Sequence, residues 1–159
     1  MTDLRFEAYQ PGDEVAISSL VWEVFSEYVG PGYAEEGIET FRQFIQPEEL
    51  RKSAASGCFN MICCWSGSEL AGVIAMRDSN HVSLLFVRRE FHRKGIAHEL
   101  FRLAKGECLG NHPEISEFSV NSSPYAVNIY ERLGFEATGP EETQNGITYV
   151  PMKMTSQKS

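Results

Sequence analysis

The residues of this chain that point most directly to chemistry lie between Leu84 and Ala97. An apolar run there ends in a cationic corner, passes Gly95 and continues into apolar residues at helical spacing. Where a strand ends and a helix begins, the first N–H groups of the helix lack intrahelical partners and carry roughly half a positive charge. Gly95 leaves the main chain open to a ligand, and Arg93 and Lys94 add full charges beside these amides. The segment therefore predicts a binding site for a phosphate group.

Residues 92–97 read His-Arg-Lys-Gly-Ile-Ala, and by themselves they also fit an ordinary strand–turn–helix connection with solvated basic residues. They resemble the acyl-CoA-binding pattern of the GCN5-related N-acetyltransferases (GNAT family), Gln/Arg-x-x-Gly-x-Gly/Ala. His92 stands where the family usually carries Gln or Arg, and a histidine still donates a hydrogen bond. Residues 122–135 read SSPYAVNIYERLGF and are similar to the family's second signature, a short helix ending in Tyr-Glu-x-Leu-Gly-Phe. The two segments occur in the family's order, and the resemblance extends from about residue 4 to residue 154.

The resemblance implies an α/β (α+β) fold, with a mixed central sheet of about seven strands flanked by about four helices. In this fold, the strands at residues 81–87 and 115–121 run parallel and splay apart, and the V-shaped cleft between them receives acyl-CoA. The 159 residues, 42% of them hydrophobic, suit one core. We therefore expect a single N-acetyltransferase domain at residues 1–154 and a flexible tail at 155–159.

Apolar periodicity and turn residues predict the elements of such a domain. Ser123 and Pro124 are typical of an N-cap and a first helical position, and Gly134 is typical of a helix end. In order, we expect a strand at 4–8, a helix through 20–28 that ends at 30–32, a helix at 35–45, further helical turns at 48–55, a hairpin of 59–65 and 70–77, a strand at 81–87, a helix from 95 to near Gly106 or Gly110, a strand at 115–121, a short helix up to Gly134, and a hairpin of 135–139 and 147–154.

The resemblance also implies a cofactor, acetyl-CoA (coenzyme A), and residues that bind it. The pantetheine arm would pair with main chain near Phe86 and Val87, and a backbone N–H near Val87 would stabilise the oxyanion. Asn121, Ser123 and Asn128 are candidate hydrogen-bond partners of the cofactor or the acceptor, and Ser123 stands where asparagine is common. The complete expected cofactor-binding set is Phe86, Val87, His92, Arg93, Lys94, Gly95, Ile96, Ala97, His98, Asn121, Ser123 and Asn128.

Catalysis needs a proton donor for the leaving thiolate, and the resemblance assigns this role to Tyr130, four residues before Gly134. The alternative for Tyr130 is an aromatic side chain that only packs in the core. Many relatives carry a glutamate as general base on the strand before the phosphate loop, but residues 81–87 contain no carboxylate. Glu23, Glu27 and His81 are candidates that fit solvated surface positions better, and water is a sufficient base for an amine. We assign no general base.

The resemblance implies an N-acetyltransferase that moves an acetyl group from acetyl-CoA to a primary amine of a small molecule or a peptide or protein, by direct attack in a ternary complex. The alternative is a non-catalytic module that binds or senses acyl-CoA, which the missing strand carboxylate and His92 leave open. Aromatic residues between positions 22 and 44 are candidates to line the acceptor pocket or to fill the core. A homodimer is compatible with the sequence.

Composition limits the partners and the location. The net charge of −8, from 22 acidic and 14 basic residues, argues against nucleic acid; it suits a cationic acceptor, although it also simply keeps a protein soluble. The first residues do not resemble a secretion signal, and no apolar stretch approaches the ~20 residues that cross a membrane, so we expect a cytoplasmic protein. We expect the four cysteines, Cys58, Cys63, Cys64 and Cys108, to be buried free thiols. We expect no metal site, because their spacing is not that of metal ligands.

Overall fold

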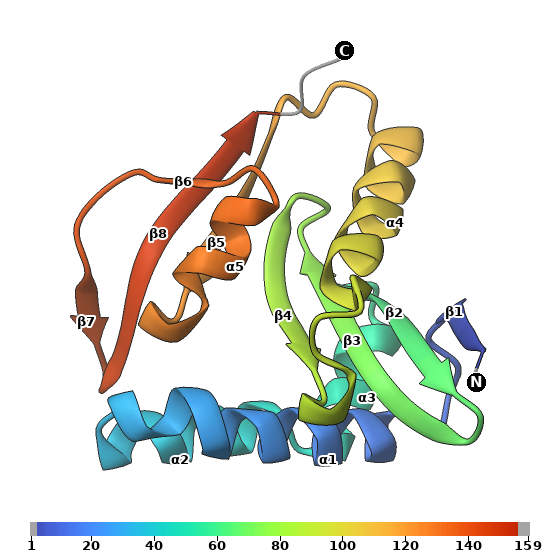
Figure 1. Ribbon diagram of the computed structural model, residues 1–159, viewed down its shortest axis with the longest axis horizontal. Coiled ribbons are helices and arrows are strands. Elements are labelled where there is room, and N and C mark those ends of the chain that lie inside the picture. Colours follow the sequence, from blue (N-terminus) through green and yellow to red (C-terminus); the bar gives the residue numbers. More distant parts are fainter. Residues whose placement is uncertain (1–2, 156–159) are drawn as a thin grey trace.

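The computed structural model describes residues 3–155, and in this part of the chain eight strands form one mixed sheet (Figure 1). The order of the main sheet is β1-β2-β3-β4-β5-β8-β6, and β7 pairs with β8. Every pairing is antiparallel except that of β4 with β5. The strands are β1 (Leu4–Ala8), β2 (Phe59–Ser66), β3 (Glu69–Arg77), β4 (His81–Val87), β5 (Glu117–Ser122), β6 (Glu136–Ala137), β7 (Glu142–Gln144) and β8 (Ile147–Thr155).

Five α-helices accompany the sheet in residues 3–155: α1 (Glu14–Val24), α2 (Glu35–Phe44), α3 (Pro47–Ala55), α4 (Ile96–Asn111) and α5 (Val127–Arg132). A π-helical turn, Phe25–Val29, continues α1, and short 3₁₀ turns lie at Gly30–Gly32, Arg89–Phe91 and Pro124–Ala126. None of these helices has the length and apolar character needed to cross a membrane. The mixed α/β architecture expected from the family resemblance is confirmed.

Apolar side chains cover both faces of the sheet because alternate residues of β2 and β3 point in opposite directions. Cys63 and Val73 lie in the core under α1 and α3, whereas their neighbours Cys64 and Ile74 lie in the core under α4. All four side chains are buried. The two cores fix α1 and α4 on opposite sides of the strand that leads to the predicted phosphate loop.

The strands β4 and β5 separate soon after they meet. Within the described residues their parallel pairing is confined to His81 with Ser119 and Val82 with Val120. A hydrogen bond of 2.8 Å between His81 Nδ1 and Ser119 Oγ joins the two strands at this closed end. Beyond Val82, β4 stays paired with β3 and β5 stays paired with β8, so the edges that face each other have no strand partner. Their free backbone groups are available to a ligand that enters the gap.

Some elements differ from the sequence-based expectation. The helix α4 passes Gly106 and ends at Asn111, beside Gly110, so the second of the two expected ends is confirmed; Cys108, buried in the core, holds the last turns against the sheet. Thr155 is the last residue of β8 rather than the start of the tail, and residues 156–159 lie outside the described residues. The strand β7 was not expected, since its residues Glu-Thr-Gln carry no apolar pattern.

A close contact ties α2 to the turn between β7 and β8. This turn is Asn145-Gly146, with φ of 54° and 79°, the left-handed values that a two-residue hairpin turn needs. The N–H of Ala34 donates to the carbonyl of Gly146 at 3.1 Å. A Cβ atom at Gly37 would lie 2.3 Å from the same carbonyl oxygen, so only glycine fits there. Figure 1 shows α2 below the ends of β7 and β8, where this contact holds it.

Candidate active site

A pocket of about 630 Å³ lies where β4 and β5 have separated. Its lining comes from the end of α1 and the π-helical turn, Tyr33, α2, β4, the loop before α4 and its first turn, β5, and the segment that leads into and through α5. Eleven of the thirteen predicted site residues are among them: Phe86, Val87, His92, Arg93, Gly95, Ile96, Ala97, His98, Asn121, Ser123 and Tyr130. Lys94 and Asn128 are exposed and lie outside this lining. The fold thus brings both signature segments to one cavity.

The loop before α4 has a backbone shaped for close approach. Arg93 and Gly95 both adopt left-handed conformations, with φ of 66° and 77°. A Cβ atom at Gly95 would have nothing within 4 Å, so the space in front of this residue is open. The 16-residue helix α4 begins at the next residue, and no side chain caps its first turn. The N–H groups of that turn are therefore free to bind an anion, with Arg93 beside them.

His92 closes the loop back onto the end of β4. Its Nε2 lies 2.8 Å from the carbonyl oxygen of Val87, and because a carbonyl only accepts, Nε2 carries the hydrogen. The N–H of Arg88 donates to the carbonyl of Ala71 on the β3 side at 2.8 Å. Backbone groups alternate along an antiparallel strand, so the N–H of Val87 points away from β3, into the gap. This N–H is a hydrogen-bond donor for a ligand oxygen.

Tyr130 lies at the inner wall of the pocket on α5. Its side chain is only 6% exposed and packs edge-on against Phe135, with 5.6 Å between ring centroids. Among residues 3–155 its hydroxyl has no hydrogen-bond partner, and burial raises the pKa of this phenol. The group is therefore protonated at neutral pH, and its proton is free for a bound ligand.

Ser123 positions the segment that carries Tyr130. As expected for an N-cap, its hydroxyl accepts a hydrogen bond from the N–H of Ala126 at 3.3 Å, and Pro124 occupies the first helical position. Ser123 also lines the pocket. Because its oxygen already accepts from the backbone, Ser123 has its hydroxyl proton left to offer a ligand.

Two aromatic contacts that the sequence did not suggest join the sides of the cleft. Tyr28, from the π-helical turn, stacks on Tyr125 with 5.0 Å between centroids and packs against His92 at 5.6 Å. Tyr125 lines the pocket. The only sequence signal for this role is the position of Tyr125 within the second signature segment. Together these rings link the loop before α4 to the segment before α5.

None of the three candidate bases lines the pocket. Glu23 accepts from Arg88 at 2.6 Å and Glu27 from Arg89 at 2.7 Å, both on the outer surface. His81 lies at the closed end of the strand pair, bonded to Ser119, and burial lowers its pKa. Within residues 3–155 no aspartate or glutamate contributes to the pocket wall. The described lining offers hydroxyl groups and histidines to an amine, but no carboxylate.

The comparisons with known proteins agree with this geometry. A family model described as an acetyltransferase (GNAT) domain matches residues 29–156. The chain belongs to the GNAT acetyltransferase family. An uncharacterized N-acetyltransferase, YafP of Escherichia coli K12, is 25% identical over 145 residues, which cover 91% of this chain and 89% of YafP.

Solved structures show that the GNAT fold extends over nearly the whole chain. The PaiA N-acetyltransferase of Thermoplasma acidophilum, solved in complex with coenzyme A, has a TM-score of 0.77 at 18% identity and covers 96% of this chain and 99% of its own. A GCN5-related N-acetyltransferase from Rhodopseudomonas palustris has a TM-score of 0.76 at 16% identity, and the match covers 98% of this chain and 96% of the Rhodopseudomonas chain. At these identities the likeness establishes the fold.

The cysteines of this GNAT protein give a prediction that bears on its assay. Burial raises the pKa of Cys63 to about 12 and the pKa of Cys64 and Cys108 to about 11, whereas Cys58 is exposed. Since the thiolate is the reactive form, only about a thousandth or less of each buried thiol is ionised at pH 8. We expect a thiol reagent to titrate one thiol per native chain and all four in guanidinium chloride.

Rapid reaction of more than one native thiol would contradict the buried placement of Cys63, Cys64 and Cys108. In described residues, no group of three or more metal-ligating side chains is close enough together to hold a metal ion. A blank without protein is the control for the thiol count.

Proposed function

We propose that the protein transfers an acetyl group from acetyl-CoA to a primary amine by direct attack in a ternary complex. One observation carries this proposal: a single pocket combines the uncapped start of α4, the unpaired edge of β4 and the unpartnered hydroxyl of Tyr130. Membership of the GNAT family, whose other members include a protein solved with coenzyme A, supports the choice of acyl donor.

The shape and chemistry of the pocket fit acetyl-CoA. The left-handed loop, the open space at Gly95 and the free N–H groups of α4 suit a pyrophosphate, with Arg93 as a countercharge. Asn121, at the open edge of β5, is a candidate partner for the pantetheine amides. Lys94, outside the lining, would act through its charge at the surface rather than by contact. Acetyl-CoA supplies an acetyl group held as a thioester.

The chain's own groups would act at two atoms of the reacting centre. The N–H of Val87 donates to the acyl oxygen, where negative charge develops as the amine attacks. The Tyr130 hydroxyl gives its proton to the sulfur as the C–N bond forms and the C–S bond breaks. The attacking amine loses its own proton to water, and water restores the proton to Tyr130. Because the pocket is largely apolar, it favours the uncharged amine that this reaction needs.

The test is release of coenzyme A, read with a thiol reagent, across a panel of amines that includes polyamines, amino acids, aminoglycosides, lysine peptides and arylalkylamines. We expect at least one amine to give release above the acetyl-CoA-only rate, with the acetylated amine found by mass spectrometry. A blank with protein alone corrects for Cys58. If acetyl-CoA raises the melting temperature but no amine in the panel reacts, the protein is an acyl-CoA-binding module and the proposal fails.

A further inference from the structure

The acceptor end of the pocket is the part that faces α1, the π-helical turn, α2 and the middle of β4. Its walls are apolar or aromatic, apart from two hydroxyl groups. The residues are Val24, Phe25, Val29, Tyr33, Phe41, Ser83 and Phe86, whereas Leu85, which also lines the pocket, packs against the core under α4. The ionisable nitrogen groups of the lining, His92, Arg93, His98 and Arg132, come from the loop before α4, from α4 itself and from α5. The charges therefore serve the donor side of the pocket.

Aromatic rings form a continuous surface at this acceptor end. Phe25 and Phe41 stack with 4.2 Å between centroids, Tyr33 meets Phe25 edge-on at 5.2 Å, and Phe86 lies 6.2 Å from Phe41. These four residues are called the aromatic wall below. Phe25 lies in the π-helical turn, Tyr33 before α2, Phe41 in α2 and Phe86 in β4. Phe25 is buried and supports the wall from behind, whereas Tyr33, Phe41 and Phe86 are half-buried, and rings of this kind bind an apolar ring by offset stacking or edge contact.

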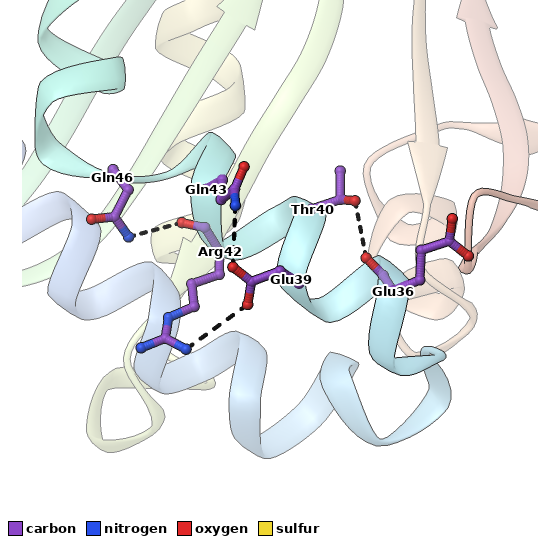
Figure 2. Close-up of polar contacts among 6 residues, drawn as sticks. All are labelled: Glu36, Glu39, Thr40, Arg42, Gln43 and Gln46. Atoms are coloured by element: carbon purple, nitrogen blue, oxygen red, sulfur yellow. Dashed lines mark hydrogen bonds and ion pairs between the residues drawn. The ribbon is translucent and has the colours of Figure 1, made fainter.

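Three carboxylates on the same helical segments are paired outside the pocket. Glu23 and Glu27 hold Arg88 and Arg89 on the outer surface. Figure 2 shows Glu39 of α2 between Arg42 and Gln43, on the face of the helix that carries its polar contacts. None of these three carboxylates lines the pocket. A second positive charge on an acceptor would therefore enter the acceptor end without a countercharge, which is costly.

Two hydroxyl groups remain to receive the amine. The side chains of Ser83 and Tyr33 both line the pocket, and within residues 3–155 neither hydroxyl makes a hydrogen bond. They are able to accept from the amine directly or to hold a water molecule that takes its proton. The acceptor end thus offers polar contacts for one amine and apolar contacts for everything else. The pocket of about 630 Å³ must also hold the acyl end of the donor, which leaves space for a small acceptor.

From these observations we infer that the acceptor is a small primary amine on an aromatic body, of the arylalkylamine class, and that the aromatic wall holds its ring. This inference rests on the proposed acetyl transfer. It differs from the expectation from net charge, which favoured a cationic acceptor in general: the acidic residues lie on the surface and not in the pocket.

The test compares kcat/KM for 2-phenylethylamine, spermidine, an aminoglycoside and a lysine peptide, with acetyl-CoA saturating. We expect kcat/KM for 2-phenylethylamine to exceed that for each of the other three amines by about tenfold or more. The reason is that each uncompensated charge and each lost ring contact weakens binding of the transition state. A preference for spermidine, the aminoglycoside or the peptide would overturn the inference and leave the proposed function standing. Failure of all four amines, with acetyl-CoA still bound, would overturn the inference, and the proposed function fails only if every other amine of the wider panel is inactive as well.

Two phenylalanines of α2 provide a matched pair of variants. Phe41 belongs to the aromatic wall, whereas Phe44 is 39% exposed and outside the pocket. We expect Phe41→Ala to lower kcat/KM for 2-phenylethylamine by about 10- to 100-fold and to leave the thermal shift by acetyl-CoA unchanged. Phe44→Ala should change kcat/KM for the same amine by less than about threefold. Phe41→Leu, which keeps apolar bulk, is the substitute if Phe41→Ala does not fold. Equal values for the Phe41 variant and the wild type would overturn the inference.

Discussion

Replacing Tyr130 by phenylalanine is expected to lower kcat by roughly 10²- to 10⁴-fold, the usual contribution of general acid catalysis, and to leave acetyl-CoA binding nearly unchanged. The substitution removes a hydroxyl that faces the pocket without a partner among the described residues. It keeps the ring that packs against Phe135. The loss should lie toward the lower limit, because a thiolate is already a good leaving group. Steady-state kinetics with the best amine gives kcat, and the thermal shift by acetyl-CoA reports binding.

Tyr149→Phe is the control for Tyr130→Phe. Tyr149 lies on β8, where its hydroxyl donates to Glu142 at 3.3 Å, and it is outside the pocket. Tyr149→Phe also removes one phenolic hydroxyl group, but outside the pocket, so kcat should not change. Full activity of Tyr130→Phe, with product release shown not to limit the rate, would exclude the proton-donor role. A joint loss of stability and of acetyl-CoA binding would instead identify Tyr130 as a core residue.

Replacing Gly95 by valine is expected to abolish the rise in melting temperature that acetyl-CoA causes. The φ of 77° at Gly95 is a conformation that a β-branched residue avoids, and the open space in front of it is where the proposed pyrophosphate approaches. The side chain would both block this space and displace the loop. At 100 times its dissociation constant, a ligand stabilises the fold by about 2.7 kcal/mol, so the lost shift is easily measured by thermal unfolding.

Gly67→Val separates the strain of the substitution from the loss of binding. Gly67 has a φ of 63° in the turn between β2 and β3, with nothing within 4 Å of an added Cβ and no part in the pocket. Both variants should lose a similar amount of stability, of order 1–3 kcal/mol, but Gly67→Val should keep the full shift. If Gly95→Val also keeps it, the loop before α4 does not bind the pyrophosphate. Gly95→Ala, with its smaller side chain, is the fallback if the valine variant does not fold.

Local patterns were enough to predict most of the fold. The apolar runs of β2, β3 and β4, and the cap formed by Ser123 and Pro124, are decided by residues close in the sequence, and the structure confirms them. Local patterns left two possible ends for α4, and the helix continues past Gly106 to the second of them because the burial of Cys108 outweighs a glycine that costs about 1 kcal/mol in a helix. The strand β7 has no apolar alternation, but the Asn-Gly pair at 145–146 was a hairpin signal.

The candidate site was predictable where it depends on signature segments. Those segments placed eleven of the thirteen candidates in the lining. The sequence did not separate Arg93, which lines the pocket, from Lys94, which does not, because a left-handed turn at Arg93 sets where each side chain lies. The acceptor end depends on contacts between distant segments, such as Phe41 of α2 with Phe86 of β4. Periodicity alone does not distinguish such a wall from a core.

The contact between Gly37 and Gly146 limits how segments can be exchanged to change the acceptor specificity that we propose for this protein. A helix transplanted from another enzyme in place of α2 would bring its own residue at position 37, and any side chain there collides with the hairpin turn. The helix and the hairpin therefore form one module, and a chimera should exchange residues 33–45 and 142–148 together. The same reasoning applies to inheritance: we expect positions 37 and 146 to change jointly among close homologues, although they lie 109 positions apart along the chain.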